Sequence, residues 1–83
     1  MAMTTAERQD RIKEIICDIL ELEENEVTLT SHFVEDHGAD SLRAIEILAS
    51  LEKEFGVVID QSELARMINL EAVFQVLSET AAW

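Results

Sequence analysis

The sequence contains no proline, no tyrosine, one cysteine and only two glycines among its 83 residues. A single cysteine, Cys17, cannot form an internal disulfide, which favours a reducing compartment for so small a chain. No apolar run approaches the roughly 20 residues of a membrane-spanning helix, and the opening residues MAMTTAERQD lack the apolar stretch of a signal peptide. We therefore expect a cytoplasmic protein with no membrane partner.

Basic side chains are also scarce. Six Lys and Arg residues stand against eighteen Asp and Glu, which gives a formal net charge of −12 at pH 7. Such a chain repels a phosphate backbone, so we expect no nucleic-acid partner, and it is steered towards basic protein surfaces. The 48% apolar content suffices for one small core, and no repeat or low-complexity tract interrupts it. We expect a single domain over residues 1–83, ordered over about 5–80.

Apolar spacing predicts the first helix. Thr4 and Glu7 match a capping box, which is typical of a helix start. Behind them five aliphatic side chains recur at helical spacing: Ile12, Ile15, Ile16, Ile19 and Leu20. The predicted helix runs from about Thr5 to Leu22. Cys17 falls at the margin of its apolar face, where we expect a small, partly buried side chain rather than a reactive thiol.

The helical period is lost between Glu23 and Asp40, and a connection of this length is uncommon in a compact domain unless it is functional. Its apolar residues predict that the loop packs on the helices, and they are Val27, Leu29, Phe33 and Val34. Gly38 is the natural position for a left-handed backbone twist.

Three further segments complete the predicted fold. A second helix runs from about Ser41 to Phe55 and ends at Gly56, and a packed connector follows at Val57–Ile59. A short third helix is expected at Ser62–Met67. Asn69 then caps a last helix whose apolar positions are Leu70, Val73, Phe74 and Leu77. The predicted fold class is all-α: a small four-helix bundle with a long first loop and a short third helix.

The second helix carries two apolar stripes when it is placed on a wheel of roughly 100° per residue. The predicted core face consists of Ala44, Ile47, Leu48, Leu51 and Phe55. A separate stripe, Leu42, Ile45 and Ala49, is bordered by Glu46, Glu52 and Lys53 and is therefore expected at the solvent boundary. An exposed apolar stripe rimmed by charge is typical of a partner contact. The alternative is that the helix is buried more deeply on that side.

Ser41 stands at the start of the same helix, where unpaired N–H groups and the helix dipole favour an anion. A phosphate esterified to its Oγ would be stabilised there. From the residues alone a serine in this position is more often an N-cap, although Asp40 can also fill that role.

The residues Phe33 to Leu42, FVEDHGADSL, resemble the modification-site region of acyl carrier proteins. The resemblance continues through the spacing of Glu46, Leu51-Glu52 and Glu54-Phe55-Gly56, and it covers about Ala6 to Leu77. It implies that a phosphopantetheinyl transferase attaches 4′-phosphopantetheine covalently to Ser41, and that the thiol of this arm carries acyl groups as thioesters. It also implies a chain that is not an enzyme, has no catalytic residue and binds no metal.

The resemblance also implies partners, namely an acyltransferase, a ketosynthase or other acyl-processing enzymes, which would meet the carrier as a monomer. The partner surface transferred by position consists of Asp40, Leu42, Arg43, Ile45, Glu46, Ala49 and Glu52.

Three residues depart from the fatty-acid pattern: His37 replaces a usual leucine, and Arg43 and Lys53 replace commonly acidic residues. Arg43 is expected to alter the charge beside the arm. These departures favour a discrete carrier of a specialised pathway such as polyketide assembly.

Several alternatives stay open at this point. A housekeeping fatty-acid carrier or a peptidyl carrier would use the same arm, and a helical interaction module would use the apolar stripe without modification.

Ser41, His32, His37 and Asp36 are close in sequence, but the elbow typical of serine hydrolases is missing. Two histidines without a nearby cysteine make a poor zinc site, and Asp36, Gly38 and Asp40 match only part of a calcium loop.

Overall fold

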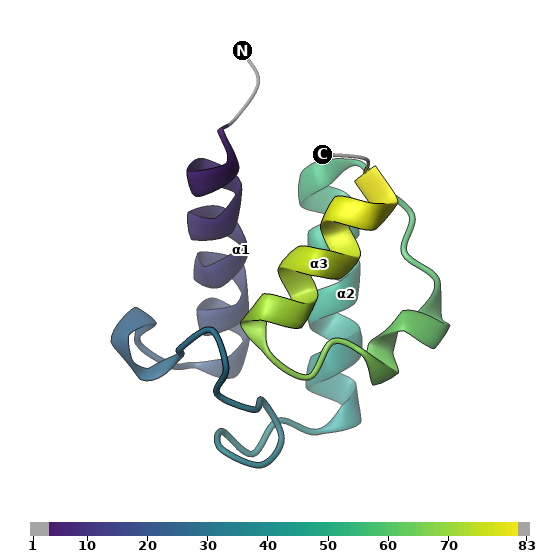
Figure 1. Ribbon diagram of the computed structural model, residues 1–83. Coiled ribbons are helices and arrows are strands. Elements are labelled where there is room, and N and C mark those ends of the chain that lie inside the picture. Colours follow the sequence, from purple (N-terminus) through teal and green to yellow (C-terminus); the bar gives the residue numbers. More distant parts are fainter. Residues whose placement is uncertain (1–3, 82–83) are drawn as a thin grey trace.

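The structure, a computed structural model, describes residues 4–81. Within this range the chain forms three α-helices and two short 3-10 helices and no strand (Figure 1). In order along the chain they are α1 (Thr5–Leu20), η1 (Glu24–Glu26), α2 (Ser41–Phe55), η2 (Gln61–Ala65) and α3 (Leu70–Ala81). The all-helical class is confirmed. The segment expected as a short third helix is the 3-10 helix η2, so the count of four helices is not confirmed.

Helix α1 begins with the expected capping box. The Thr4 hydroxyl accepts the Glu7 N–H at 3.1 Å, and the Glu7 carboxylate accepts the Thr4 N–H at 3.1 Å. The hydrogen bond from the Thr4 backbone lowers the pKa of Glu7. The helix ends at Leu20, two residues before the expected end, because Glu21 adopts a left-handed conformation with φ of 58°.

Helix α2 begins and ends, and helix α3 begins, at the signals expected from the sequence. Gly56 terminates α2 with φ of 62°, a conformation that costs glycine little and other residues more. The Asn69 side chain accepts the Ala72 N–H at 2.8 Å and so caps the start of α3. None of the helices within residues 4–81 is long and apolar enough to cross a membrane.

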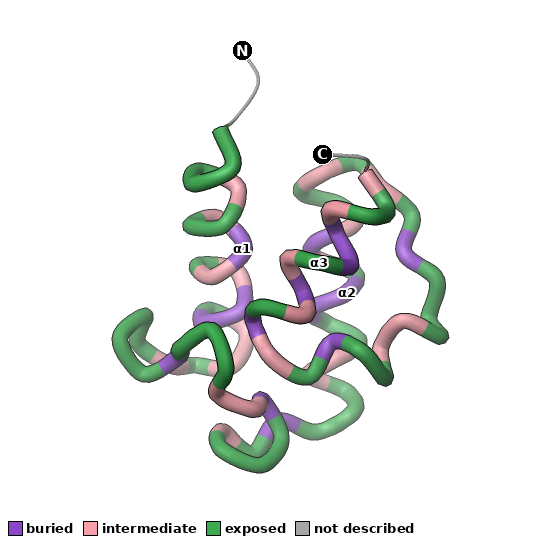
Figure 2. Tube along the Cα trace, viewed as in Figure 1, coloured by how far each residue is buried: buried purple, intermediate pink, exposed green. Residues whose placement is uncertain are grey.

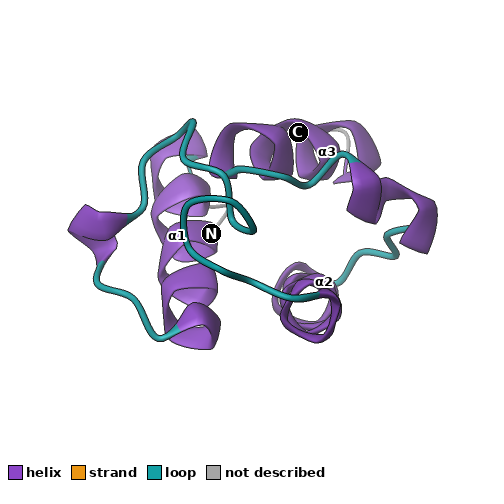
Figure 3. Cartoon of the chain, turned by 90° about the horizontal axis from the view of Figure 1, so that it is seen from below, coloured by secondary structure: helices purple, strands orange, loops and turns teal. Residues whose placement is uncertain are grey.

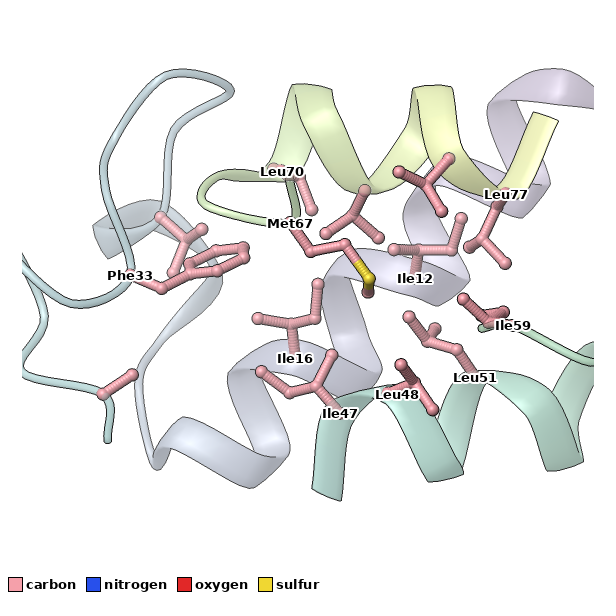
Figure 4. Close-up of a cluster of buried hydrophobic side chains, with 14 of the residues drawn as sticks. Ile12, Ile16, Phe33, Ile47, Leu48, Leu51, Ile59, Met67, Leu70 and Leu77 are labelled. Carbon is pink, nitrogen blue, oxygen red and sulfur yellow. The ribbon is translucent and has the colours of Figure 1, made fainter. Parts of the chain in front are cut away.

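The core lies where the three α-helices meet, and Figure 4 shows their side chains pointing towards one another. Its most deeply buried members are Ile12, Ile16, Val27, Leu51, Val73, Val76 and Leu77. The predicted core face of α2 is confirmed for four of its five residues: Ile47, Leu48 and Leu51 are buried and Phe55 packs against the core, whereas Ala44 is only half-buried and lies outside the core cluster. Cys17 is only 4% exposed, deeper than the partial burial expected, and this burial raises the pKa of its thiol.

Helices α1 and α2 run antiparallel, and an arginine joins them near each end. Arg11 of α1 forms an ion pair with Glu54 near the end of α2. Arg43 near the start of α2 donates to the carbonyl of Ile19 at 2.9 Å, in the last turn of α1. A cation at that position also meets the negative end of the α1 dipole. The Arg43 contact thus ties the start of α2 to the end of α1, and the Arg11–Glu54 pair ties the end of α2 to α1.

The connection between α1 and α2 lies across one end of the bundle (Figure 3). Val27 and Phe33 are buried, whereas Leu29 and Val34 are exposed, so only part of the expected packing is found (Figure 2). The Phe33 N–H donates to the carbonyl of Ile68 at 2.9 Å, which ties the loop to the segment before α3. Gly38 has φ of 68°, as expected.

The connector between α2 and η2 packs against the core at Val57 and Ile59 but not at Val58. Ile59 is buried, and its N–H donates to the Glu52 carboxylate at 2.8 Å. Val58 is 85% exposed, so the apolar run there does not form a continuous packed segment.

Candidate functional site

Ser41 is the first residue of α2, and Asp40 occupies the N-cap position before it. The Asp40 carboxylate accepts the Arg43 N–H at 2.9 Å, and the Asp40 carbonyl accepts the Ala44 N–H at 3.1 Å. Asp40 therefore performs the capping function for which Ser41 was the other candidate. Ser41 is exposed, and no group within residues 4–81 hydrogen-bonds its hydroxyl.

The surroundings of Ser41 suit a bound phosphate and offer no base to activate the hydroxyl. The first turn of α2 presents backbone N–H groups and the positive end of the helix dipole. The nearby imidazoles have other partners, since His37 Nε2 lies 3.0 Å from the Ser31 hydroxyl and His32 Nδ1 accepts backbone N–H groups. The hydroxyl is thus placed to receive a group delivered by another protein rather than to start catalysis itself.

The described residues can be compared with the side-chain clusters that bind metal ions in proteins. Within residues 4–81 no three side chains of His, Cys, Asp or Glu gather as a metal site. The Asp36 carboxylate accepts the His32 N–H at 2.6 Å, and the Asp40 carboxylate caps α2. Both of these carboxylates from the partial calcium pattern therefore serve the local backbone.

The approach to Ser41 is fixed by a short network of backbone hydrogen bonds. The Ala39 N–H donates to the Phe33 carbonyl at 2.9 Å, and the Gly38 N–H donates to the Val34 carbonyl at 2.9 Å. Phe33 and Ala39 are both buried, so the residues immediately before Asp40 are anchored in the core. Ser41 consequently projects from a fixed point on the surface.

The apolar stripe of α2 is exposed, as the helical wheel predicts. Leu42 is 62% exposed, Ile45 is 44% exposed, and Ala49 is exposed as well. The helix is therefore not buried more deeply on this side. The stripe begins immediately beside Ser41 and continues along the same helix.

Three charged residues around this stripe, Glu46, Glu52 and Arg43, have partners inside the molecule. Glu46 lies 3.6 Å from the Arg43 guanidinium, and the Glu52 carboxylate accepts the Ile59 N–H. Arg43 also lies 3.8 Å from Glu21 and donates to the end of α1, so its charge is directed at α1 rather than presented beside Ser41. Sequence reasoning missed the contacts of Arg43 with Ile19 and Glu21 because they join segments far apart along the chain.

An apolar cavity of about 80 Å³ lies behind Ser41, between the long loop, α2 and the segment before α3. Its lining consists of His32, Phe33, Val34, Ala39, Ala44, Ile47, Leu64, Met67 and Ile68. Larger depressions of about 230 Å³ between α1 and α3 and about 390 Å³ between α1 and α2 are lined by residues remote from Ser41. The small cavity was not foreseen, because the long loop, α2, η2 and the segment before α3 all contribute residues to it.

Comparisons with known proteins agree with this geometry. The family described as "Phosphopantetheine attachment site" matches residues 10–77. The chain is 63% identical over 82 residues to the Polyketide-8 synthase acyl carrier protein 1 of Streptomyces avermitilis, covering 95% of this chain and 98% of that protein. It is 42% identical over 77 residues to the acyl carrier protein of Petrotoga mobilis, covering 93% and 91% of the two chains.

A solved structure is also similar. A chain of the structure described as "The ishigamide ketosynthase/chain length factor" aligns with a TM-score of 0.77 and 42% identity, covering 93% of this chain and 97% of that chain. The all-helical fold and the exposed serine at the start of α2 agree with a phosphopantetheine-dependent carrier. The chain belongs to that attachment family and, within it, to the acyl carrier proteins. Members of this group are carriers and not catalysts.

Proposed function

We propose that this chain is the discrete acyl carrier protein of a polyketide pathway and carries acyl intermediates as thioesters on an arm attached to Ser41. The observation that carries the proposal is the exposed Ser41 hydroxyl, which no group within residues 4–81 hydrogen-bonds because Asp40 caps α2 in its place. The whole chain, residues 1–83, acts as one carrier domain and as a monomer in the cytoplasm.

The loading step needs little from the carrier. A phosphopantetheinyl transferase brings coenzyme A, and the Ser41 oxygen replaces the nucleotide part on the phosphorus of the phosphopantetheine. The hydroxyl proton passes to the transferase, because no base within residues 4–81 is paired with Ser41. The resulting phosphodiester lies at the start of α2, where the helix dipole stabilises its negative charge.

The proposed pathway rests on the relatives. Two of them, at 63% and 39% identity, are acyl carrier proteins of a polyketide-8 synthase in Streptomyces avermitilis. The similar chain of known structure comes from a ketosynthase/chain length factor structure. We therefore propose a ketosynthase as a partner of this chain, with an acyltransferase or other acyl-processing enzymes before and after it. The exposed stripe of Leu42, Ile45 and Ala49 is the proposed contact surface.

Native mass spectrometry after incubation with coenzyme A and a promiscuous phosphopantetheinyl transferase tests this proposal. Wild-type protein is expected to gain the mass of one arm and to remain a single chain per particle. Ser41→Ala is expected to gain nothing, whereas Ser50→Ala, which removes a serine elsewhere on α2, should gain one arm as wild type does. A wild-type chain without added mass would contradict the proposal and leave the unmodified interaction module.

The cargo separates the remaining carriers. Loading of malonyl or a longer polyketide intermediate by a cognate acyltransferase or ketosynthase supports the proposed pathway. Loading of an amino acid by an adenylating enzyme would instead favour a peptidyl carrier, and preference for fatty-acid elongation enzymes would favour the housekeeping carrier.

A further inference from the structure

His32 stands at the start of the turn Phe33–His37, eight residues before the end of the loop at Asp40. Its Nδ1 atom lies 3.2 Å from the backbone nitrogen of Val34 and 3.2 Å from that of Glu35. Both backbone groups are donors, so Nδ1 must act as an acceptor. The neutral ring therefore carries its proton on Nε2.

A reciprocal contact closes the turn from the other side. The His32 N–H donates to the Asp36 carboxylate at 2.6 Å, and the Asp36 N–H donates to the His32 carbonyl at 2.8 Å. The His32 ring, for its part, accepts N–H groups two and three residues ahead of it. Side chains of aspartate and asparagine usually make contacts of this kind. In this chain an imidazole performs the same capping function.

The capped turn connects the core to the proposed attachment site. Phe33, the first residue of the turn, is buried and donates a backbone hydrogen bond to Ile68. Ala39, two residues after the turn, is buried and donates a backbone hydrogen bond to Phe33. Asp40 and Ser41 follow directly. The His32 ring also lines the apolar cavity beside the start of α2. A change in the turn would therefore reach both the cavity wall and the orientation of Ser41.

We propose that His32 is a positioning residue for Ser41, and that protonation of its imidazole opens the capped turn. This inference rests on the proposed role of Ser41. A protonated ring carries a hydrogen on Nδ1, which then faces two N–H donors and cannot accept from either. The rate of arm loading therefore decreases as the pH is lowered, and the size of this decrease depends on the side chain at position 32.

Two charged residues lie close to His32 along the chain, in its own turn. These residues are Glu35 and Asp36. His37, the other imidazole of the loop, lies within hydrogen-bond distance of the Ser31 hydroxyl. The residues of other elements that line the cavity shared with His32 are uncharged: Ala44 and Ile47 from α2, Leu64 from η2, and Met67 and Ile68 before α3. Arg66, next to that segment, is paired with Glu63 and Glu79.

Nitrogen-15 NMR of the unmodified chain tests the cap without any reference to Ser41. At pH 7.5 the His32 Nδ1 signal is expected at the position of an acceptor nitrogen and the Nε2 signal at that of a protonated one. Protection of the Val34 and Glu35 amides from hydrogen exchange should drop by about fivefold between pH 7.5 and pH 5.5, the effect of a lost cap. A neutral ring protonated on Nδ1 would overturn the proposal, as would unchanged protection.

Three variants then test the consequence for loading. His32→Asn keeps a side-chain acceptor that does not titrate, so its loading rate at pH 5.5 should exceed that of wild type by about fivefold under the same transferase. His32→Ala is expected to load slowly at both pH values. His37→Asn removes the other imidazole and should keep the wild-type pH response. Equal pH profiles for wild type and His32→Asn would overturn the positioning role.

The two sets of measurements separate this inference from the proposed function. If wild type takes up no arm at either pH, the assignment of Ser41 fails, and with it the positioning role of His32. The NMR result would still decide whether His32 caps the turn. If wild type loads normally but its pH response matches that of His32→Asn, only the present inference fails.

Discussion

Cys17 is the only thiol that the amino-acid sequence provides, and its burial matters for a chain proposed to carry cargo on the thiol of an arm. The side chain lies in the core, with its sulfur 3.9 Å from the Glu23 carbonyl. Burial raises the pKa of this thiol, so less of the reactive thiolate forms at neutral pH. The burial of Cys17 thus keeps its thiol, a second nucleophile beside that of the arm, away from acyl donors.

We expect Cys17 to react with a maleimide at pH 7.5 at least about tenfold more slowly in the native chain than in denaturant, because burial limits both thiolate formation and access. Mass spectrometry after timed quenching measures the label. The chain loaded with an arm serves as the control, since its arm thiol should be labelled promptly under native conditions. Equal rates for the native and unfolded chain would contradict the buried position.

Ser41 and Arg43 show what could be predicted at the residue scale and what could not. The local sequence Asp40-Ser41 placed a serine and a capping carboxylate at a helix start, and the resemblance to a family selected Ser41. The sequence did not reveal that Asp40 would be the cap, since both side chains suit that position. It also suggested that Arg43 would change the charge beside the arm, whereas the guanidinium reaches the end of α1. Contacts across 24 positions have no local signal.

At the scale of elements, the helix ends follow local chemistry and the short connections follow packing. The capping box at Thr4, Gly56 and the Asn69 cap were readable because each acts within a few residues. The end of α1 was missed because Glu21, a residue without a preference for left-handed backbone, terminates it. Helix η2 is a 3-10 helix capped by Asp60, whose hydrogen bond from Ser62 lowers its pKa. Five residues give too short a window for periodicity to distinguish the two helix types.

Helix α2 combines the proposed attachment residue with an exposed apolar stripe, and this combination can be tested. Ile45→Asp places a charge in the middle of the stripe. We expect acyl transfer between the loaded carrier and its ketosynthase to slow on the order of tenfold, the effect of losing roughly 1.4 kcal/mol of contact energy. The helical circular dichroism should stay unchanged, because Ile45 is 44% exposed.

Val58→Asp is the matched control for that substitution. Val58 is also an exposed aliphatic residue, but it lies in the connector after α2. We expect its transfer rate to stay close to that of wild type. Equal losses in both variants would show a general effect of added negative charge rather than a docking stripe. Loss of helical signal in Ile45→Asp would show that the residue supports the core.

At the scale of the whole molecule, acidity opposes compaction. The radius of gyration of the Cα atoms is 11.7 Å, close to the roughly 12 Å expected of a compact domain with this number of residues. A formal net charge of −12 is therefore confined to a small volume, where like charges repel. The six described ion pairs are all solvent-accessible and contribute little each. The hydrophobic core must offset the remaining repulsion.

Added salt is accordingly expected to stabilise the chain. Raising sodium chloride from about 0.02 M to 0.5 M shortens the screening length well below the size of the domain and weakens the repulsion among its carboxylates. We expect the melting temperature at pH 7 to rise by about 5 °C, which corresponds to roughly 1 kcal/mol for a domain of this size. Thermal circular dichroism at both salt concentrations measures this rise. Salt also weakens attractive pairs such as Arg11–Glu54 and Arg66–Glu79, so a falling melting temperature would mean that those pairs outweigh the net charge.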